Sequence, residues 1–395
     1  MVRYPALARP GRLGDIPLRN RTVMASLTRN RSDPDTYPCE ENVYYYSQRA
    51  KETGAGLIIA EAAYIYPQGS EWLHAPGIYD SKHAQAWKKV VDAVHEEGCA
   101  IVAQLHHVGR IAHPESPEQV KSGHPVYAPS PVAARGGKFR HLPGKPGFVV
   151  PTQLEDFDMV FDAYENAARC AKEAGFDGVE VHGGNGYLVD EFLTDTCNRR
   201  TDEWGGSVEK RCRFGLEAIK RCIKVWGPER VGIKLSPCGG YNDMYFSSHE
   251  ENIATHKHMV SELDKLGIAY IQLSQYNSGS DPTHGGVHQG FKHDVVRTYG
   301  PLAKTSKILA VAEYTGEKAN EEVSAGLVEA VAFGTLYMYN PDLYHRIQHD
   351  LPINSAGNVW AHYNIIEGDV RKGYSDYPFS EEATVVATPI TSVTA

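Results

Sequence analysis

The sequence predicts an α/β fold, a single (β/α)8 TIM barrel in which eight parallel strands alternate with helices. Two observations carry this prediction: short apolar runs recur along the chain, and longer amphipathic stretches separate them. A third is that several of the amphipathic stretches stop at a glycine, as helices commonly do. We assign residues 1–380 to one barrel domain and residues 381–395 to a flexible C-terminal tail, because that tail is small and polar.

The predicted strands are near-continuous apolar runs, as parallel strands require when helices cover both faces of the sheet. They span residues 21–26, 57–63, 100–105, 178–182, 231–236, 269–274, 308–312 and 330–334. A doubly wound sheet would also alternate strands with helices. The number of runs and the lack of G-x-G-x-x-G after the first run favour the closed barrel.

The predicted helices lie between these strands. They span residues 40–54, 82–98, 157–175, 207–227, 248–267 and 315–326. The connection after the third strand, about residues 106–156, is rich in Pro, Gly and His and much longer than a usual βα loop. We expect this extended third βα loop to form a cap over the barrel mouth.

Composition narrows the function classes. The 395 residues are 42% hydrophobic and 23% charged, which is ordinary for a globular protein. The net charge of −9 argues against nucleic acid or an anionic membrane as the main partner. No apolar run approaches the roughly 18 residues of a membrane-spanning helix. The seven cysteines form no C-x-x-C motif, which predicts reduced thiols and a cytoplasmic enzyme.

Polar side chains follow the predicted strands at their C-terminal ends, where barrels of this kind place their chemistry. His182 ends the fourth strand, and Asn185 follows after two glycines. Two neutral N–H donors that converge fit a carbonyl oxygen that gains negative charge during a reaction. Tyr187 adds a phenol that can act as the general acid. The alternative is that His182 and Asn185 only cap the strand–helix turn.

A pair of adjacent histidines raises the possibility of a metal site. His106 and His107 lie at the end of the third strand, but no carboxylate or third ligand is suitably spaced near them. We therefore expect no metal.

One long segment resembles a known family. The stretch VHGGNGYLVDEFLTDTCNRRTDEWGGSVEKRCRF, residues 181–214, is similar to the signature of the old yellow enzymes, which are flavin-dependent ene-reductases on a (β/α)8 barrel. Shorter matches include LTRNR, YYYSQRA, GLIIAEA, QLHHVGR, GIKLSP and GYSDYP. The resemblance spans about residues 5–380.

The resemblance implies a function and roles for residues. It implies reduction of an activated C=C, as in an α,β-unsaturated carbonyl compound, with NAD(P)H through FMN. His182 and Asn185 would grip the activating group of the substrate, and Tyr187 would protonate the alkene α-carbon. The implied substrate is a small molecule, a hydrophobic enone or enal of specialised metabolism, and a homo-oligomer is compatible with the sequence.

The resemblance also implies which residues surround the cofactor and the substrate. Thr28 would bond the flavin O4 edge, and Gln104 would lie along the ring. The remaining cofactor positions are Ala62, Lys234, Ala312, Glu313, Gly334 and Thr335. Tyr276 and Tyr377 are assigned to the substrate pocket, Tyr377 at its rim.

The sequence departs from the family pattern where FMN is held. Thr335 stands where the family has an arginine on the phosphate, and Ala312–Glu313 replace a glycine-rich turn. Lys234 replaces an arginine against the flavin. These changes leave two possibilities open. FMN could be bound weakly or not at all, because charge-assisted bonds to a phosphate contribute roughly 1.5–3 kcal/mol each. Alternatively, Lys234 together with backbone and helix-dipole donors suffices to hold FMN.

Two smaller departures accompany them. His106 stands where tryptophan is common, and Ser26 replaces a proline. Together the changes leave open a flavin-independent acid/base isomerase or cyclase that acts on an enone-bearing metabolite. A catalytically silent binding barrel is the third reading, and the intact His182, Asn185 and Tyr187 argue against it.

Overall fold

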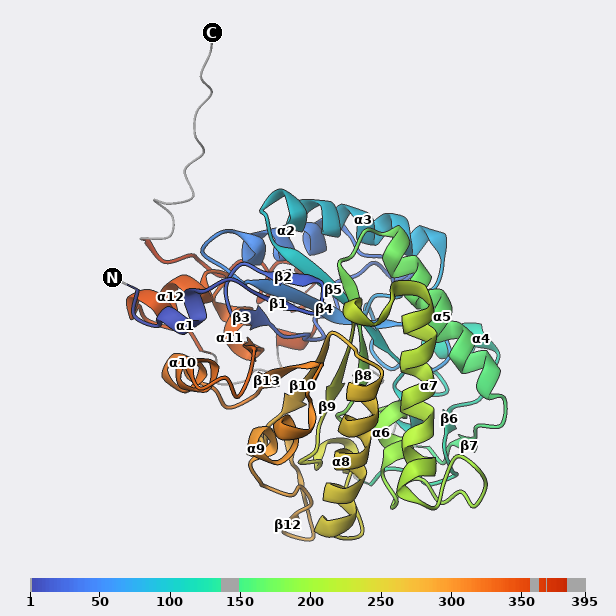
Figure 1. Ribbon diagram of the computed structural model, residues 1–395. Coiled ribbons are helices and arrows are strands. Elements are labelled where there is room, and N and C mark those ends of the chain that lie inside the picture. The colour runs from blue at the N-terminus through green and yellow to red at the C-terminus, as the bar shows by residue number, and fades with distance from the viewer. Residues whose placement is uncertain (1, 136–148, 356–361, 367, 382–395) are drawn as a thin grey trace.

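The computed structural model describes residues 2–135, 149–355, 362–366 and 368–381. Its centre is a closed barrel of eight parallel strands, in the order β10-β13-β14-β3-β4-β5-β8-β9 (Figure 1). The strands are β3 (Thr22–Met24), β4 (Leu57–Tyr64), β5 (Ala100–His106), β8 (Gly178–Gly183), β9 (Val231–Leu235), β10 (Tyr270–Ser274), β13 (Lys307–Val311) and β14 (Ala330–Phe333). The predicted barrel is confirmed, and the doubly wound sheet is wrong because β14 pairs with β3 and closes the ring.

The long helices pack around the outside of the barrel. They are α2 (Glu40–Ala50), α3 (Ser81–Glu96), α5 (Phe157–Glu173), α7 (Val208–Trp226), α8 (His249–Lys265) and α10 (Gly316–Ser324). All of them except α3 lie within a range that the sequence predicts, and α3 begins one residue before its predicted range, at Ser81. Polar side chains cap the N-termini of several of these helices. Asp156 caps α5 and Ser207 caps α7, and each accepts a hydrogen bond from an N–H of the first turn.

Shorter elements complete the chain, and the apolar pattern did not indicate them. The helices are α1 (Pro5–Ala8), α4 (Pro117–Ser122), α6 (Leu188–Leu193), α9 (Val295–Tyr299), α11 (Thr335–Tyr339) and α12 (Leu343–His349). The short strands are β1 (Gly11–Leu13), β2 (Ile16–Leu18), β6 (Tyr127–Ala128), β7 (Thr152–Gln153), β11 (Thr283–His284) and β12 (Val287–His288).

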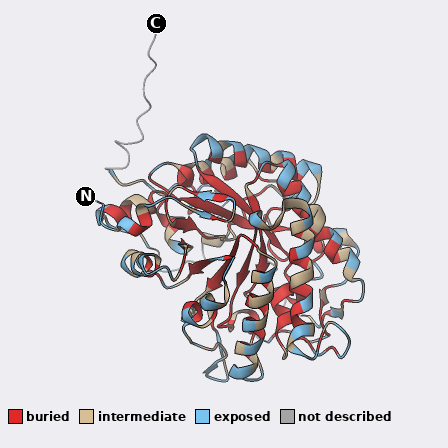
Figure 2. Cartoon of the chain, viewed as in Figure 1, coloured by how far each residue is buried: buried red, intermediate tan, exposed pale blue. Residues whose placement is uncertain are grey.

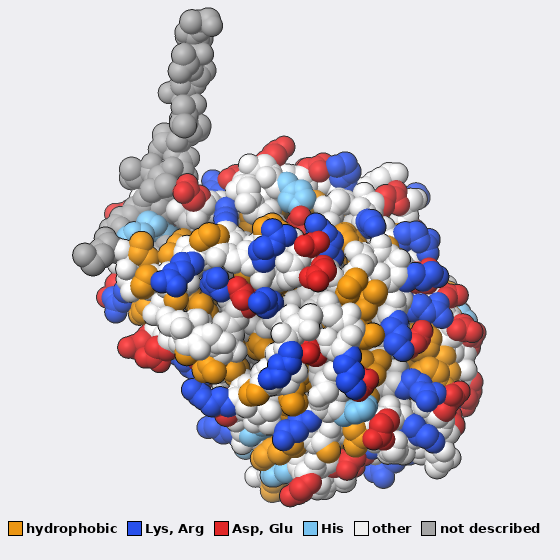
Figure 3. Space-filling view, viewed as in Figure 1, with side chains coloured by type: hydrophobic (Ala, Val, Ile, Leu, Met, Phe, Trp, Pro, Cys, Tyr) orange, Lys and Arg blue, Asp and Glu red, His pale blue; other side chains and the backbone are white. Residues whose placement is uncertain are grey.

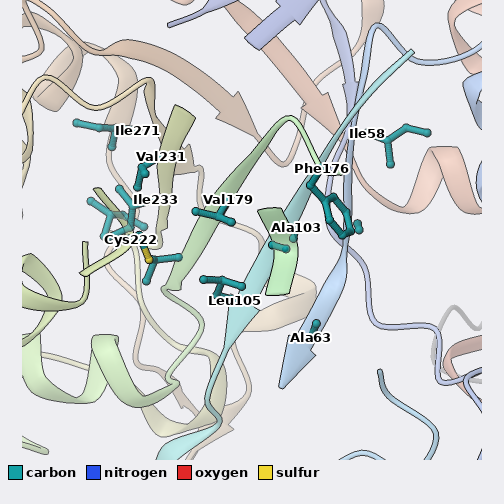
Figure 4. Close-up of a cluster of buried hydrophobic side chains, with 14 of the residues drawn as sticks. Ile58, Ala63, Ala103, Leu105, Phe176, Val179, Cys222, Val231, Ile233 and Ile271 are labelled. Atoms are coloured by element: carbon teal, nitrogen blue, oxygen red, sulfur yellow. The ribbon is translucent and has the colours of Figure 1, made fainter. Parts of the chain in front are cut away.

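The core forms two layers, because the barrel strands are buried on both faces (Figure 2). One layer lies between strands and helices and includes Ala103, Leu105, Val179 and Ile233 (Figure 4). The other fills the barrel interior. The β1–β2 hairpin adds Leu13, Ile16 and Leu18 to that inner layer, and a Cβ on Gly178 would lie 2.9 Å from Ile16 Cδ1.

The connection after β5 carries α4, β6 and β7. Its residues Val108, Ile111 and Ala112 pack in one apolar cluster with Trp72 and Tyr187. The described part of this extended loop therefore covers the side of the barrel on which β5 and β8 end. Residues 136–148, the middle of the predicted cap, lie outside the described residues.

The segment near the C-terminus packs back on the barrel. Tyr374 stacks on Tyr45 with ring centroids 4.0 Å apart, and the Arg29 guanidinium donates to the Gly373 carbonyl at 2.6 Å. Most of the predicted tail, residues 382–395, lies outside the described residues, so the domain boundary stays a prediction.

The surface adds two observations about partners. On the face in Figure 3, lysine and arginine side chains alternate with acidic ones. Among the described residues, no helix combines the length and apolar character that crossing a membrane requires.

Candidate active site

A cavity of about 310 Å³ opens at the C-terminal ends of the barrel strands. Most of the residues that the sequence assigned to the site line this one cavity. They are Thr28, Ala62, Gln104, His182, Asn185, Tyr187, Lys234, Ala312, Glu313, Gly334 and Thr335. They come from seven of the eight barrel strands or the loops that follow them. The eighth strand, β10, contributes Ser274 to the cavity lining.

His182 is held as a neutral donor. It lies on β8, is 6% exposed, and its Nδ1 accepts the Gly184 N–H at 3.4 Å. Burial lowers the pKa of His182 well below its usual range, and His106 and Lys234 lower it further. A neutral ring whose Nδ1 accepts a hydrogen bond carries its proton on Nε2, so Nε2–H is the group that a ligand can meet.

Asn185 is oriented by Ser236. The Ser236 hydroxyl donates to Asn185 Oδ1 at 2.8 Å and accepts the Asn185 backbone N–H at 3.2 Å. Because Oδ1 is used, the Nδ2 amide group remains to donate. The contact needs glycine at position 184, since a Cβ there would lie 2.4 Å from Ser236 Oγ. Asn185 itself has φ 58°, a left-handed conformation that asparagine tolerates better than most residues.

Tyr187 lies beside both donors. It precedes α6 and is 7% exposed. Its ring meets the His182 ring edge to face, with centroids 5.0 Å apart and an interplanar angle of 83°. The imidazole, the amide and the phenol therefore share one wall of the cavity.

A buried polar chain supports Gln104. Its Nε2 donates to Glu180 Oε1 at 2.6 Å, and its Oε1 accepts the Ser26 hydroxyl at 2.8 Å. Gln272 Nε2 donates to the other Glu180 oxygen at 3.1 Å. Burial raises the pKa of Glu180 to about 7 despite these donors. The pair of bonds fixes the rotamer of Gln104 at the cavity floor.

Lys234 is a buried cation that lines the same cavity. It is 8% exposed, and burial lowers its pKa, while the charge of Glu180 opposes that shift. A buried cation in this state favours an electron-rich or anionic ligand group next to it.

At the end of the cavity that is formed by the loops after β13 and β14, backbone N–H groups are available to a ligand. Ala312 and Glu313 both have positive φ, 72° and 56°. Thr335 begins α11, whose N-terminus has no side-chain cap. The first N–H groups of a helix have no acceptor inside the helix, so they can bind an anion. Glu313 and Thr335 are exposed there, and neither adds a positive charge.

The sequence model of the NADH:flavin oxidoreductase / NADH oxidase family matches residues 6–354. The chain belongs to this family. It is 38% identical to a probable flavin mononucleotide-dependent alkene reductase from Leishmania infantum, over 94% of this chain and 97% of that protein. The structure of an old yellow enzyme homologue from Zymomonas mobilis matches with a TM-score of 0.83 and 34% identity, over 94% of this chain and 99% of that one.

Morphinone reductase solved in complex with tetrahydroNAD is similar too, at 34% identity and a TM-score of 0.82, over 95% of this chain and 98% of that one. The resemblance to the old yellow enzymes, read from residues 181–214, is thereby confirmed.

The cavity residues fit the flavin mononucleotide of this family. Lys234 offers the buried cation for the electron-rich edge of the ring, Ala62 gives a small wall, and Thr28 brings a hydroxyl. At the phosphate end the open backbone and the start of α11 fit, while Glu313 opposes the negative charge. The fit is complete at the ring and depends on backbone donors at the phosphate.

Two assigned residues of this flavin oxidoreductase lie elsewhere. Tyr377 does not line the cavity, and its hydroxyl bonds His362 Nδ1 at 2.8 Å. Tyr276 does not line it either, and its hydroxyl donates to Asp281 Oδ2 at 3.0 Å. Tyr363 and Trp72 stand in the cavity wall instead.

Ser236 and Tyr363 line the cavity and were not identified from the sequence. Ser236 lay inside a predicted strand, at the C-terminal end of the apolar run, and that position was its one signal. Trp72 and Tyr363 come from segments with no periodic pattern. Only the folded path of those segments brings them to the cavity.

Proposed function

We propose that the protein is an FMN-dependent, NAD(P)H-consuming ene-reductase that acts on α,β-unsaturated carbonyl compounds. The observation that carries the proposal is the shared wall of the cavity. There His182 Nε2–H and Asn185 Nδ2–H remain as donors while their other polar atoms are bonded within the protein. Tyr187 stands next to them.

Each residue has one step in this reaction. The two donors bind the carbonyl oxygen and stabilise the negative charge that it gains as the β-carbon is reduced. Tyr187 gives its proton to the α-carbon, so hydrogen is added across the C=C. When bound, FMN supplies the hydride, which it has taken from NAD(P)H.

The remaining residues hold the cofactor and exclude water. Lys234 balances charge at the flavin edge, and Gln104 is fixed below it by Glu180. The apolar cluster of Trp72, Val108 and Tyr187 closes one side of the cavity. That burial strengthens every polar contact inside.

We also propose a substrate class and a cellular location. The wall contains Leu27, Trp72, Tyr363 and Phe333, which suits a hydrophobic enone or enal. The relatives are reductases, so an acid/base isomerase or cyclase is not favoured. A cytoplasmic location is supported by the seven cysteines, all of which are free.

Tyr187→Phe tests the proposal. Without the phenol the alkene cannot be protonated, so we expect alkene reduction to slow by about 10²- to 10⁴-fold. NAD(P)H should still bleach the flavin colour at its normal rate. Stopped-flow measurement of the two half-reactions separates these steps.

Two results would contradict the proposal. One is a Tyr187→Phe protein that reduces an enone as fast as the wild type. The other is a purified wild-type protein that, with added FMN, consumes no NAD(P)H in the presence of any enone. The second result would return the isomerase or cyclase to consideration.

A further inference from the structure

His106 has no role in the function described above. It is the last residue of β5, is 3% exposed, and lines the cavity. Its ring lies 4.9 Å from the His182 ring and 4.4 Å from the Tyr187 ring, measured between centroids. It therefore sits in contact with the groups that bind and protonate the substrate.

Within the part of the chain that the structure describes, the protein leaves one polar atom of His106 without a partner. Its Nδ1 is buried and has no hydrogen-bond partner among the described residues. The next residue differs: His107 Nε2 bonds Gln68 Oε1 at 2.7 Å, and His107 Nδ1 accepts the Gly109 N–H at 3.1 Å. A buried polar ring that is left unpaired costs stability, so its retention at a cavity calls for an explanation.

The His106 ring is neutral. Burial lowers its pKa to about 3, and His107 and Lys234 act in the same direction. A neutral imidazole has one N–H donor and one acceptor. It can therefore bond a hydroxyl or a carbonyl oxygen, and it does not form an ion pair with a carboxylate.

We propose that His106 makes the enzyme prefer enones and enals that carry a second oxygen, a hydroxyl or a carbonyl, close to the carbonyl that His182 and Asn185 hold. This inference rests on the proposed function for the position of that carbonyl. The centroids of the two imidazole rings lie 4.9 Å apart, so a single small substrate can contact both rings.

A matched pair of substrates tests the preference. The FMN-loaded enzyme is assayed with 6-hydroxycyclohex-2-enone and with 6-methylcyclohex-2-enone, which have nearly the same shape. We expect kcat/KM to favour the hydroxyl compound by about tenfold in the wild type, as one hydrogen bond to a buried group provides. In His106→Phe the preference should vanish, because the ring remains and its nitrogens do not.

Two control variants test whether an effect of His106→Phe comes from the lost ring nitrogens. His106→Asn keeps a donor and an acceptor and should retain part of the preference, which keeps the test valid if His106→Phe folds poorly. His124→Phe removes an imidazole whose ring lies near Tyr66 and Tyr127 and does not line the cavity. It should keep the full preference. Flavin content and melting temperature are measured for each variant.

A binding arm separates this inference from the proposed function. The saturated 2-hydroxycyclohexanone and 2-methylcyclohexanone cannot be reduced at a C=C, and their dissociation constants follow from the shift in flavin absorbance. If no enone is reduced but the hydroxyl ketone binds about tenfold tighter through His106, the proposed function fails and the recognition stands. If both enones are reduced equally by the wild type and His106→Phe, and the ketones bind equally, the inference is overturned and the function stands.

Discussion

His182 and Asn185 are prepared for a carbonyl oxygen by the atoms that do not touch it. Gly184 occupies Nδ1 of the imidazole, and Ser236 occupies Oδ1 of the amide. In both side chains the remaining polar group is therefore a donor. This pre-arrangement means that no side chain has to turn when the oxygen gains charge, which is the condition for effective electrostatic stabilisation.

Ser236→Ala should weaken this arrangement without removing a donor. Asn185 would lose the bond that fixes its amide, and we expect kcat/KM for an enone to fall by about five- to tenfold, as loss of one hydrogen bond implies. Ser236→Thr keeps the hydroxyl and should recover most of the activity. The flavin reduction rate by NAD(P)H serves as the readout that should not move; a parallel fall in that rate would argue for general disruption.

Thr335→Arg should strengthen FMN binding. Thr335 lies at the start of α11, where the backbone already offers N–H donors. The side chains of Glu313 and Thr335 carry no positive charge there. One charge-assisted bond to the phosphate should lower the dissociation constant for FMN about tenfold. Quenching of flavin fluorescence on binding gives that constant.

Riboflavin, which has no phosphate, is the matched ligand for this test. Its affinity should stay the same in Thr335→Arg. Ser324→Arg places an equal charge at the exposed end of α10, away from the cavity lining, and controls for a general effect of charge. If riboflavin gains as much affinity as FMN, the phosphate does not lie at Thr335.

The sequence identified most residues of this site because strand ends follow directly from the apolar runs. His182, Lys234 and Gln104 each lie at the C-terminal end of a run, so a barrel brings them together. Tyr276 and Tyr377 do not line the cavity. Both lie in irregular segments, and no sequence pattern indicates the partners of their hydroxyl groups.

Among the secondary-structure elements, the long ones could be predicted from the sequence and the short ones could not. A barrel strand such as β4 (Leu57–Tyr64) is buried at every position, and its apolar run matches that burial. The β1 and β2 strands have three residues each, which is too few to show an alternation, so the hairpin that fills the barrel interior was missed.

The turn after β13 stores strain beside the cofactor site. Ala312 has φ 72°, where an L-residue costs roughly 1–2 kcal/mol, whereas glycine there loses only its extra chain entropy. Ala312→Gly should therefore raise the free energy of unfolding by up to about 1 kcal/mol. Urea denaturation measures it.

Ala325 provides the comparison for that turn. It ends α10 with φ −76°, an ordinary helical value, so Ala325→Gly should lower the free energy of unfolding by roughly 0.5–1 kcal/mol. Equal losses in the two variants would show that the conformation of Ala312 is not strained.

Across the whole molecule, the fold buries several carboxyl groups, among them Glu180 on β8 and Asp190 and Glu191 on α6. Burial raises the pKa of Glu180 to about 7, of Asp190 to about 7 and of Glu191 to about 8. Each is placed for a contact of the site or its loops: Glu180 fixes Gln104, and Asp190 accepts the Gly186 N–H at 2.8 Å. Function is thus supported at the expense of stability at neutral pH.

Glu180→Gln should remove part of that pH dependence. In the unfolded chain a glutamate releases its proton near pH 4.3, and in the fold Glu180 keeps it to about pH 7, so the native state binds more protons between these values. The stabilisation from its proton is complete below about pH 4.3 and is lost as the pH rises to about 7. Over that range the wild type should lose about 4 kcal/mol relative to Glu180→Gln.

Urea denaturation from pH 4.5 to 8 at a fixed FMN concentration tests this. Asp202→Asn is a control of opposite sign, because the hydrogen bond from Arg200 lowers the pKa of Asp202. That carboxylate stabilises the fold at neutral pH, and its contribution is lost as the pH falls through the lowered pKa. If the wild type and Glu180→Gln keep a constant difference over the whole range, Glu180 is ionised in the fold. Gln104 would then be held by a charged partner, and Glu180 and Lys234 would carry opposite charges on the neighbouring strands β8 and β9.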